Sequence, residues 1–243
     1  MFLLFQLFGL FHPLAEITFI NVGQGDAILV RAPFRTADIL VDTGKPSQWN
    51  ALNGFLEGKG IRRLNTMVIT HADKDHSGNM DTVKKEYRPK QVITEHQPEI
   101  HAGMYTFYDL NEIRNEDENE SSIVLFFRMN GKKILLMGDS TVHTEDTLVR
   151  SGIDLQADFL KLSHHGSHTG SGDLFLDTVQ PKLAIVSSGA YEIYHHPSPE
   201  TIERLNKRHI PYLDTKEEGD ISVFCLPGCC LLLTSRLHFE LLF

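Results

Sequence analysis

The chain has 243 residues, of which 32 are acidic and 23 are basic, so its formal net charge at pH 7 is −9. A hydrophobic fraction of 41% and a charged fraction of 23% are typical of a soluble globular protein and exclude a disordered or fibrous chain. The acidic balance argues against a protein that coats nucleic acid with a basic surface, although an enzyme can still hold nucleic acid through metal ions.

The N-terminal stretch, residues 1–15, is apolar and contains no Lys or Arg. It is too short to span a membrane, and it lacks the charged start and the cleavage site of a secretory signal. It is therefore either a buried N-terminal segment or the tail of a membrane helix from a longer protein. We expect residues 16–243 to form one domain. That domain would lie outside the cytoplasm beside the membrane in the second case, and in the cytoplasm if the chain is complete.

Short β-branched runs bounded by Gly, Asp or Asn alternate with helical segments along this domain. The predicted strands are residues 17–22, 27–31, 38–41, 66–70, 91–94, 123–128, 133–137, 158–162, 183–187, 221–225 and 230–234. The predicted helices are residues 48–58, a helix from near 77, and residues 145–151, 173–179 and 199–207. Strands dominate both halves and helices lie between them, which favours an α/β sandwich of two mixed sheets covered by helices over one doubly wound sheet.

The three cysteines, Cys225, Cys229 and Cys230, lie close together near the C-terminus. Their spacing matches neither a disulfide framework nor a paired C-x-x-C zinc motif. Because Cys229 and Cys230 belong to an apolar predicted strand, we expect buried thiols with no disulfide partner.

Histidine is the unusual residue of the composition, with 13 copies, and several of them cluster after predicted strands. The first cluster follows strand 66–70 and contains His71, Asp73, Asp75 and His76. Side chains at alternate positions of an extended backbone point the same way, so His71 and Asp73 can share one ion. Asp75 and His76, at the turn into the next helix, can then reach a second ion. A charged loop that caps a helix would explain the acids but not the two histidines.

Three more predicted strands or helices carry candidate residues at their ends. Asp139 follows strand 133–137, where each of its carboxylate oxygens could take one cation. His164 and His165 follow strand 158–162, so that one imidazole can bind metal while the other faces substrate. Ser167 in the same turn can offer its hydroxyl to an anionic oxygen. His196 precedes helix 199–207 and is either a surface-loop residue or a substrate contact.

Together these residues resemble the motif series of the metallo-β-lactamase superfamily: HADKDH, with Asp42 at the end of strand 38–41, then Asp139 and His165. The strings NVGQGDAILV, ILVDTG, VITHADKDHSGN, LLMGDS, LKLSHHGS and HPSPETIERL are more similar still to the C-terminal hydrolase domain of the ComEC family of competence DNA-uptake proteins. This resemblance covers about residues 16–235. It implies an αββα sandwich with a two-metal site at one edge, between the sheets.

The resemblance also implies which side chains hold the ions. One ion would be held by His71, Asp73 and Asp139. The other would be held by Asp75, His76, Asp139 and His165, with Asp139 bridging. Asp42 would support His71, or the loop that carries it, from behind.

The chain departs from the wider superfamily at two positions. Asp73 stands where these hydrolases most often have His, and no His precedes the Gly-Asp pair at Asp139. One site is therefore rich in oxygen ligands and open, which suits Mn²⁺ at least as well as Zn²⁺.

Two cations about 4 Å apart can lower the pKa of a shared water and neutralise a phosphate oxygen. The catalytic candidates are Asp75 at the metals, with His164, His196 and Ser167 to bind the phosphate or assist the leaving oxygen. The sequence thus predicts a phosphodiester hydrolase, with single-stranded DNA as the first candidate substrate. The ComEC resemblance implies a role in DNA uptake, which would require a membrane channel domain of a longer protein. Two alternatives stay open: a small-molecule phosphodiesterase of the phosphorylcholine-esterase kind, and an inactive, metal-stabilised interaction module.

Overall fold

The computed structural model describes residues 13–114 and 116–242, without the side chains of residues 191 and 192. The predicted N-terminal segment, residues 1–15, falls mostly on residues 1–12, which lie outside the described residues. No helix in the described part of the chain is long and apolar enough to cross a membrane.

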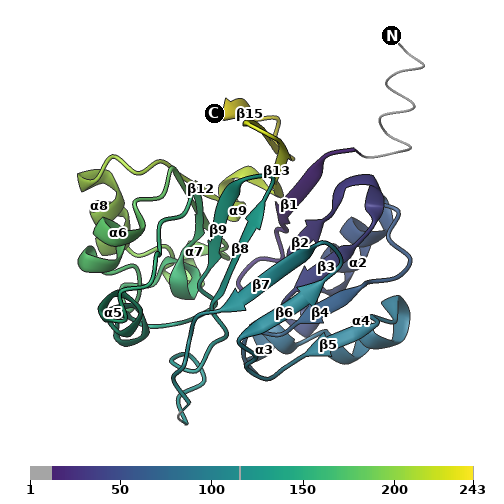
Figure 1. Cartoon of the computed structure of the whole chain (residues 1–243), viewed down its shortest axis with the longest axis horizontal. Coiled ribbons are helices and arrows are strands. Elements are labelled where there is room, and N and C mark those ends of the chain that lie inside the picture. The colour runs from purple at the N-terminus through teal and green to yellow at the C-terminus, as the bar shows by residue number, and fades with distance from the viewer. Residues whose placement is uncertain (1–12, 115, 243) are drawn as a thin grey trace.

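Two β-sheets face each other, and helices cover their outer faces (Figure 1). The strands of the first sheet are β1 Ala15–Phe19, β2 Ile28–Arg31, β3 Asp38–Val41, β4 Thr66–Val68, β5 Gln91–Ile93, β13 Ile221–Leu226, β14 Cys229–Thr234 and β15 Phe239–Leu242. The strands of the second sheet are β6 Glu99–Ala102, β7 Tyr105–Asp109, β8 Leu125–Met129, β9 Lys132–Leu136, β10 Phe159–Lys161, β11 Leu183–Val186 and β12 Tyr212–Asp214. Their orders are β15-β14-β13-β1-β2-β3-β4-β5 and β12-β11-β10-β9-β8-β7-β6.

The described residues also form helices, which alternate with the strands along the chain. They are α2 Trp49–Gly58, α3 Lys74–Ser77, α4 Met80–Tyr87, α5 Val142–Arg150, α6 Asp173–Val179, α7 Tyr191–Tyr194, α8 Pro199–Lys207 and α9 Thr215–Glu218, with 3₁₀ turns at Pro33–Arg35, Pro46–Gln48 and Ser163–Gly166. The start of α8 shows how local sequence sets a boundary. The Ser198 hydroxyl accepts a hydrogen bond from the Thr201 N–H, and Pro199 occupies the first helical position.

Three apolar layers hold these elements together. Side chains such as Phe19, Phe107 and Phe127 are fully buried between the two sheets. Leu52 of α2 and residues of α4 pack on the outer face of the first sheet. Phe175 of α6, with residues of α5 and α8, packs on the outer face of the second sheet. This arrangement confirms the predicted αββα sandwich.

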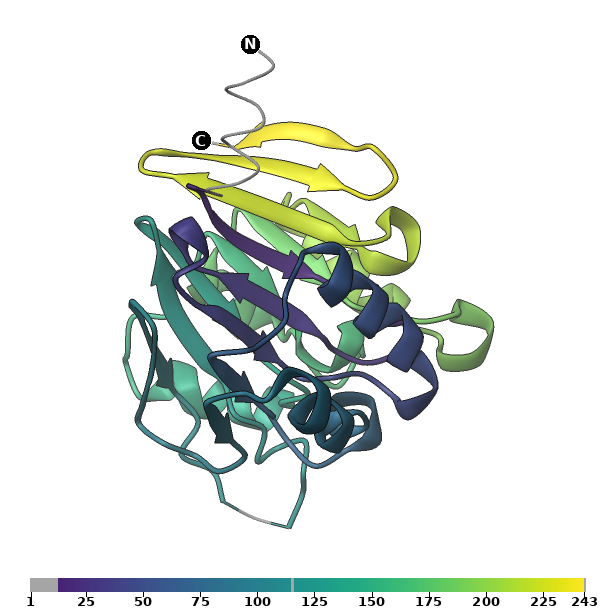
Figure 2. The same cartoon turned by 90° about the vertical axis from the view of Figure 1, so that its right-hand side faces the viewer.

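The strand directions decide where functional residues can meet. Strands β3, β4 and β5 run parallel in the first sheet, and β9, β10, β11 and β12 run parallel in the second. Because parallel strands end together at one edge of a sheet, the loops that follow them gather there. The remaining neighbours pair antiparallel, and the C-terminal strands, yellow in Figure 2, extend the first sheet beyond β1.

The C-terminal strands also correct the prediction about cysteines. Cys225 and Cys230 face each other in the β13–β14 register with their Cα atoms 4.2 Å apart, and they form a disulfide. The expectation of no disulfide partner is therefore wrong for these two residues, while Cys229 is free. A tight turn between the strands sets this register, and residue spacing alone did not reveal it.

Candidate metal centre

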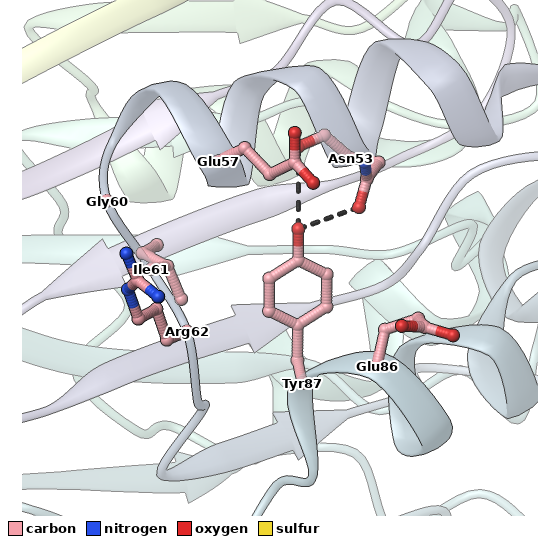
Figure 3. Close-up of a pocket in the computed structure, with 7 residues that line it drawn as sticks. All are labelled: Asn53, Glu57, Gly60, Ile61, Arg62, Glu86 and Tyr87. Carbon is pink, nitrogen blue, oxygen red and sulfur yellow. Dashed lines mark hydrogen bonds between the residues drawn. The ribbon is translucent and has the colours of Figure 1, made fainter.

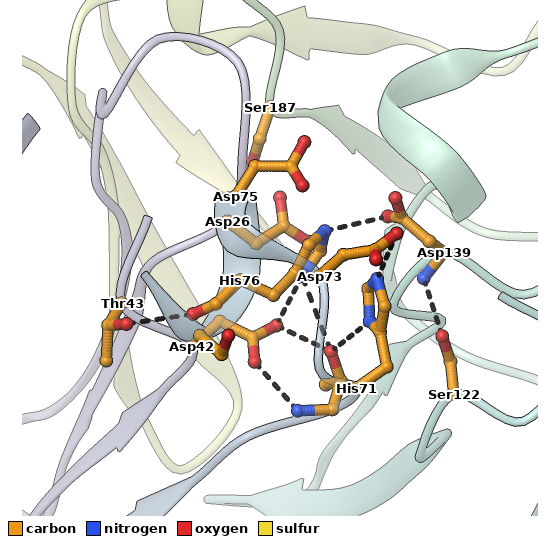
Figure 4. Close-up of polar contacts among 12 residues, drawn as sticks. Asp26, Asp42, Thr43, His71, Asp73, Asp75, His76, Ser122, Asp139 and Ser187 are labelled. Atoms are coloured by element: carbon orange, nitrogen blue, oxygen red, sulfur yellow. Dashed lines mark hydrogen bonds and ion pairs between the residues drawn. The ribbon is translucent and has the colours of Figure 1, made fainter. Parts of the chain in front are cut away.

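The ends of the parallel strands bring most of the predicted site residues together (Figure 4). Asp42 directly follows β3, and His71 lies three residues beyond β4. In the second sheet, Asp139 lies three residues beyond β9, and His164 and His165 occupy the turn after β10. Asp42, His164 and His165 all have positive φ, at 59°, 45° and 54°. Such backbone conformations are costly for these residue types and concentrate at functional sites.

His76 is fully buried and is held from both sides of its ring. Its Nδ1 lies 2.8 Å from Asp42 Oδ2, and its Nε2 lies 3.1 Å from Asp139 Oδ1. Asp42 also accepts hydrogen bonds at 2.8 Å from the Thr70 N–H and the Thr70 hydroxyl. The predicted supporting residue Asp42 therefore contacts His76 directly, and it reaches His71 only through Thr70, whose Oγ1 lies 3.1 Å from His71 Nδ1.

Asp139 lies among three histidines. Its Oδ1 faces His76, and its Oδ2 lies 3.3 Å from His165 Nε2 and 3.9 Å from His164 Nε2. The two oxygens of one carboxylate thus point to different imidazoles, which is the arrangement that a bridging ligand requires.

Several buried nitrogen and oxygen atoms at this point have no hydrogen-bond partner among the described residues. They are Nε2 of His71, His76 and His165, with Oδ1 of Asp26 and of Asp139. Their close polar contacts are ion pairs within the cluster itself, such as the 3.1 Å contact of His76 Nε2 with Asp139 Oδ1. The nitrogen on the other side of the His165 ring lies 3.0 Å from the backbone oxygen of Ser187, so Nε2 is the ring nitrogen that faces the cluster. Buried polar atoms are normally satisfied, so a converging set of unpaired imidazole nitrogens and a carboxylate fits a cation.

The other predicted ligands lie beside this group. The Asp75 carboxylate, partly exposed, has its Oδ2 3.6 Å from His165 Nε2. The His71 ring lies 4.1 Å from the His76 ring, centroid to centroid. Asp73 is the most open of them: 53% of its side chain is exposed, and its Oδ2 lies 3.7 Å from His71 Nε2.

Without a metal, the charges of the group are strongly coupled. Burial alone would lower the pKa of His76, but Asp139 and Asp42 outweigh it and raise that pKa to about 10. Burial of Asp139 is likewise outweighed by His165 and His76, which hold its pKa well below the usual range of a carboxyl. His76 is therefore protonated at pH 7 in the metal-free protein, and a metal must displace a proton to bind it.

Asp26 belongs to this cluster, although sequence reasoning missed it. Four buried residues each offer one ligand atom, and these atoms all lie within 4.8 Å of one another: Asp26, His76, Asp139 and His165. Asp26 Oδ2 lies 2.9 Å from Nζ of Lys161, a fully buried lysine, and its Oδ1 lies 3.6 Å from His165 Nδ1. The side of the His165 ring that faces Asp26 is opposite to Nε2, so Asp26 supports His165 from behind.

A signal for Asp26 was present in the sequence as Gly25. This glycine has φ = 129°, and an added Cβ would lie 2.3 Å from the backbone oxygen of Asp75. That oxygen accepts a hydrogen bond from the Asp26 N–H at 3.1 Å. A glycine that allows close backbone approach thus places Asp26 against the metal-binding loop.

The predicted phosphate-binding residues form a second group next to Asp139. The rings of His164 and His196 lie 5.9 Å apart, and His196 Nδ1 is buried without a hydrogen-bond partner among the described residues. Burial, reinforced by His165 and His164, lowers the pKa of His196 to about 4, so this imidazole is neutral at pH 7. The Ser167 hydroxyl accepts hydrogen bonds from the Thr169 N–H and hydroxyl, at 3.3 and 3.0 Å.

Two cavities differ in their relation to the cluster. A cavity of about 640 Å³ adjoins His71 and is lined by residues that include His96, Arg114, Glu116 and Glu118. Another, of about 480 Å³, lies between α2 and α4 and includes no residue of the cluster (Figure 3). Its Tyr87 hydroxyl already donates to Asn53 Oδ1 at 2.8 Å. Of these two cavities, only the first is next to the Asp–His cluster and could hold a substrate there.

Comparison with known proteins agrees with this geometry. Residues 20–116 match the family model of the Metallo-beta-lactamase superfamily. ComE operon protein 3 of Bacillus subtilis (strain 168) is 29% identical over 266 residues, which cover 91% of this chain and 34% of that protein. Competence protein ComA of Neisseria gonorrhoeae is 33% identical over 221 residues, which cover 84% of this chain and 31% of that protein. The chain therefore spans about a third of the length of these relatives.

Among solved structures, Igni18, a metallo hydrolase from the archaeon Ignicoccus hospitalis, has a TM-score of 0.57 at 12% identity. The match covers 85% of this chain and 98% of that one, and it shows a shared fold. The predicted resemblance to the superfamily and to competence proteins is thereby confirmed.

Proposed function

Because the chain carries a metallo-β-lactamase superfamily domain and is similar to competence proteins, we propose that it is a two-metal phosphodiesterase that cleaves DNA as a nuclease of the ComEC type. The observation that carries the proposal is the convergence of the buried Nε2 atoms of His71, His76 and His165 around the Asp139 carboxylate. Imidazole nitrogens and a carboxylate that converge in a buried place are best matched by bound cations.

The proposed ligands divide into two sets that share Asp139. The first is His71, Asp73 and Asp139, and the second is Asp75, His76, Asp139 and His165. The partial exposure of Asp73 and Asp75 leaves both positions open toward solvent and substrate. Because carboxylates make up more of the ligands than in an all-histidine site, Mn²⁺ is the first candidate and Zn²⁺ the second.

When bound, two divalent cations would supply positive charge for the phosphate and lower the pKa of a water toward neutrality. Asp42 fixes the His76 ring by accepting from Nδ1–H, and the Ser187 carbonyl does the same for His165. With a metal bound, both contacts would keep the one remaining ring proton on Nδ1 and leave Nε2 to the metal. Asp75, next to His165, is the carboxylate that can orient a water and take its proton.

His164 and His196 are the proposed phosphate contacts. Burial lowers the pKa of His164, and that of His196 is about 4, so both rings are neutral at pH 7. A neutral imidazole can donate one N–H to a phosphate oxygen without adding charge. The Ser167 hydroxyl accepts from Thr169 and still has its own hydrogen to donate to the same phosphate.

The competence relatives support DNA as the substrate, and DNA uptake would join this domain to a membrane channel domain of a longer protein. One observation favours a small phosphodiester instead. The cavity beside His71 holds about 640 Å³, the size of a small-molecule site, and in its lining the carboxylates of Glu116 and Glu118 outnumber the guanidinium of Arg114. Carboxylates there repel a polyanion and suit a small diester with a cationic group, such as a phosphorylcholine ester.

The two substrates are separated by assaying metal-stripped protein on single-stranded DNA and on bis-p-nitrophenyl phosphate, with Mn²⁺ or Zn²⁺ added back. The expected result is DNA cleavage that metal restores and that Asp75→Ala abolishes, while Asp146→Asn, at the surface of α5, leaves it unchanged. Turnover of the small diester alone would replace DNA by a small substrate. If the protein binds metal but turns over neither substrate, the alternative of an inactive, metal-stabilised interaction module would be favoured.

A second assay asks whether α4 guides the polynucleotide. Lys84 and Lys85 lie near its C-terminal end. Reversing both charges, by Lys84→Glu with Lys85→Glu, should raise KM for DNA and leave the small diester unaffected, because only a polynucleotide extends beyond the metal site. An equal loss on both substrates would refute this guiding role.

A further inference from the structure

Behind the histidine turn lies a buried carboxylate that the proposed chemistry does not use. Glu145, in the first turn of α5, is fully buried, six residues after the proposed bridging ligand Asp139. Its Oε1 accepts hydrogen bonds from the Ser163 hydroxyl at 2.5 Å and from the Ser171 N–H at 2.7 Å. Its Oε2 accepts one from the Gly172 N–H at 2.8 Å. One carboxylate thus joins the residue before His164 to the segment that follows the turn.

Arg204 of α8 holds the same segment through its carbonyl groups. Its Nη1 donates to Gly170 O at 2.9 Å and lies 3.4 Å from His168 O and Ser171 O. Within residues 168–172, an anion therefore binds two N–H groups, those of Ser171 and Gly172, while a cation contacts the C=O groups of three residues. Helices α5, α6 and α8 lie together on one flank of the second sheet (Figure 1), so both side chains are anchored on packed helices.

The segment is also close-packed against the start of the histidine turn. An added Cβ on Gly170 would lie 2.6 Å from Cβ of Ser163, and Ser171 has φ = 55°. The turn itself has positive φ at His164 and His165. Such conformations persist only when neighbouring contacts fix them, and Glu145 and Arg204 add contacts on both sides of the turn, at Ser163 and at residues 168–172.

We propose that Glu145 and Arg204 are positioning residues: they clamp residues 168–172 and so hold the His164–His165 turn in the geometry that the second metal ion requires. The proposal rests on the proposed function, because it concerns the ion assigned to Asp75, His76, Asp139 and His165. Keeping a carboxylate here has a cost, since burial outweighs the hydrogen bonds from Ser163, Gly172 and Ser171 and raises the pKa of Glu145 to about 7. A residue retained only for stability would not need to carry this charge.

The test measures Mn²⁺ binding to metal-stripped full-length protein at pH 8, by calorimetric titration, with thermal unfolding as a second readout. Glu145→Gln keeps the shape but leaves one carbonyl oxygen for three donors. The expected result is a 10- to 100-fold lower affinity for the second ion, the range found when a group that orients a metal ligand is lost. The affinity for the first ion should stay within about twofold of the wild-type value. The unfolding temperature at pH 8 should not fall, because the buried charge is gone.

Asp146→Asn is the matched control. Asp146 is the next residue of α5 and pairs with Arg150 at 3.8 Å on the surface, so both ions should bind as in the wild type. Arg204→Met tests the other half of the clamp, should Glu145→Gln not fold, and it should also weaken the second ion. Unchanged second-ion affinity in a folded variant of either residue, or an equal loss of both ions, would overturn the proposal.

Failure of the two-metal proposal would be recognised separately, because the wild type would then bind fewer than two ions. Hydrogen exchange of the metal-free proteins decides on the clamp in that case. Faster exchange at residues 163–172 in Glu145→Gln, but not in Asp146→Asn, is expected. Equal exchange in the three proteins would refute the clamp.

Discussion

Replacing Asp42 by asparagine tests how the metal ligands are oriented. Asp42 is 1% exposed, and its two oxygens take three contacts of 2.8 Å, from His76 Nδ1, the Thr70 N–H and the Thr70 hydroxyl. In Asp42→Asn the remaining carbonyl oxygen can keep the bond from the Thr70 N–H. The new NH₂ group then faces His76 Nδ1, and two donors cannot pair.

His76 can relieve this conflict by moving its proton from Nδ1 to Nε2 or by turning its ring, and either change removes the lone pair that faces Asp139. Loss of such an orienting partner typically costs 10- to 100-fold in metal affinity, which is about 1.4 to 2.8 kcal/mol. Calorimetric titration of metal-stripped protein should therefore show a Kd for Mn²⁺ that is higher by that factor. The increase should affect the more weakly bound ion or both ions.

Asp38→Asn is the control, because Asp38 begins the same strand and contacts Arg31 at 2.7 Å, at the opposite end of β3 from Asp42. It should lower the free energy of unfolding but leave Mn²⁺ affinity within about twofold. If Asp42→Asn binds Mn²⁺ as tightly as the wild type, the orientation of His76 by Asp42 does not matter and the reasoning fails.

Three further predictions follow from buried groups elsewhere in the chain. Because the pKa of His76 is raised to about 10 in the metal-free protein, Mn²⁺ binding at pH 7 should release about one proton from it, visible as a buffer-dependent binding enthalpy; an enthalpy independent of the buffer would contradict this. The pKa of Glu145 is raised from 4.5 to about 7, so its contribution to stability is full below pH 4.5 and is lost as the pH rises through 7. Urea unfolding in EDTA should show the wild type losing about 3 kcal/mol relative to Glu145→Gln between pH 4 and pH 8, and a difference independent of pH would refute the buried charge. Reducing the disulfide between Cys225 and Cys230, which closes a loop of 5 residues, should lower the free energy of unfolding by about 2 kcal/mol, and Cys229→Ser should leave it unchanged.

Local sequence signals predicted much of the fold. Helices α6 and α8 begin and end as predicted, because Ser198 and Pro199 mark the start of α8, and apolar periodicity sets its buried face. Strands β6 and β7 were missed although their exposed and buried side chains alternate, as in Glu99–Ala102, because each strand has only 4 or 5 residues and so shows few repeats of the pattern. Their pairing, which sequence does not display, makes them strands.

The site was predicted where ligands cluster along the chain and was missed where partners are distant. Residue type and spacing were sufficient to predict the ligands that fall within six residues, His71, Asp73, Asp75 and His76. Gly25 marks a close backbone approach beside Asp26, but the contact of Asp26 with Lys161, far away in sequence, appears only once the chain is folded. A tertiary contact of this kind has no local pattern.

An anomalous difference map from a crystal of this protein soaked in Mn²⁺ would show directly whether the cluster holds two ions. We expect two peaks about 3.5 to 4 Å apart, one on each side of the Asp139 carboxylate, with one next to Nε2 of His71 and the other next to Nε2 of His76 and His165. A single peak, a peak on the Asp26 side of His165, or no peak at all would contradict the two-metal assignment.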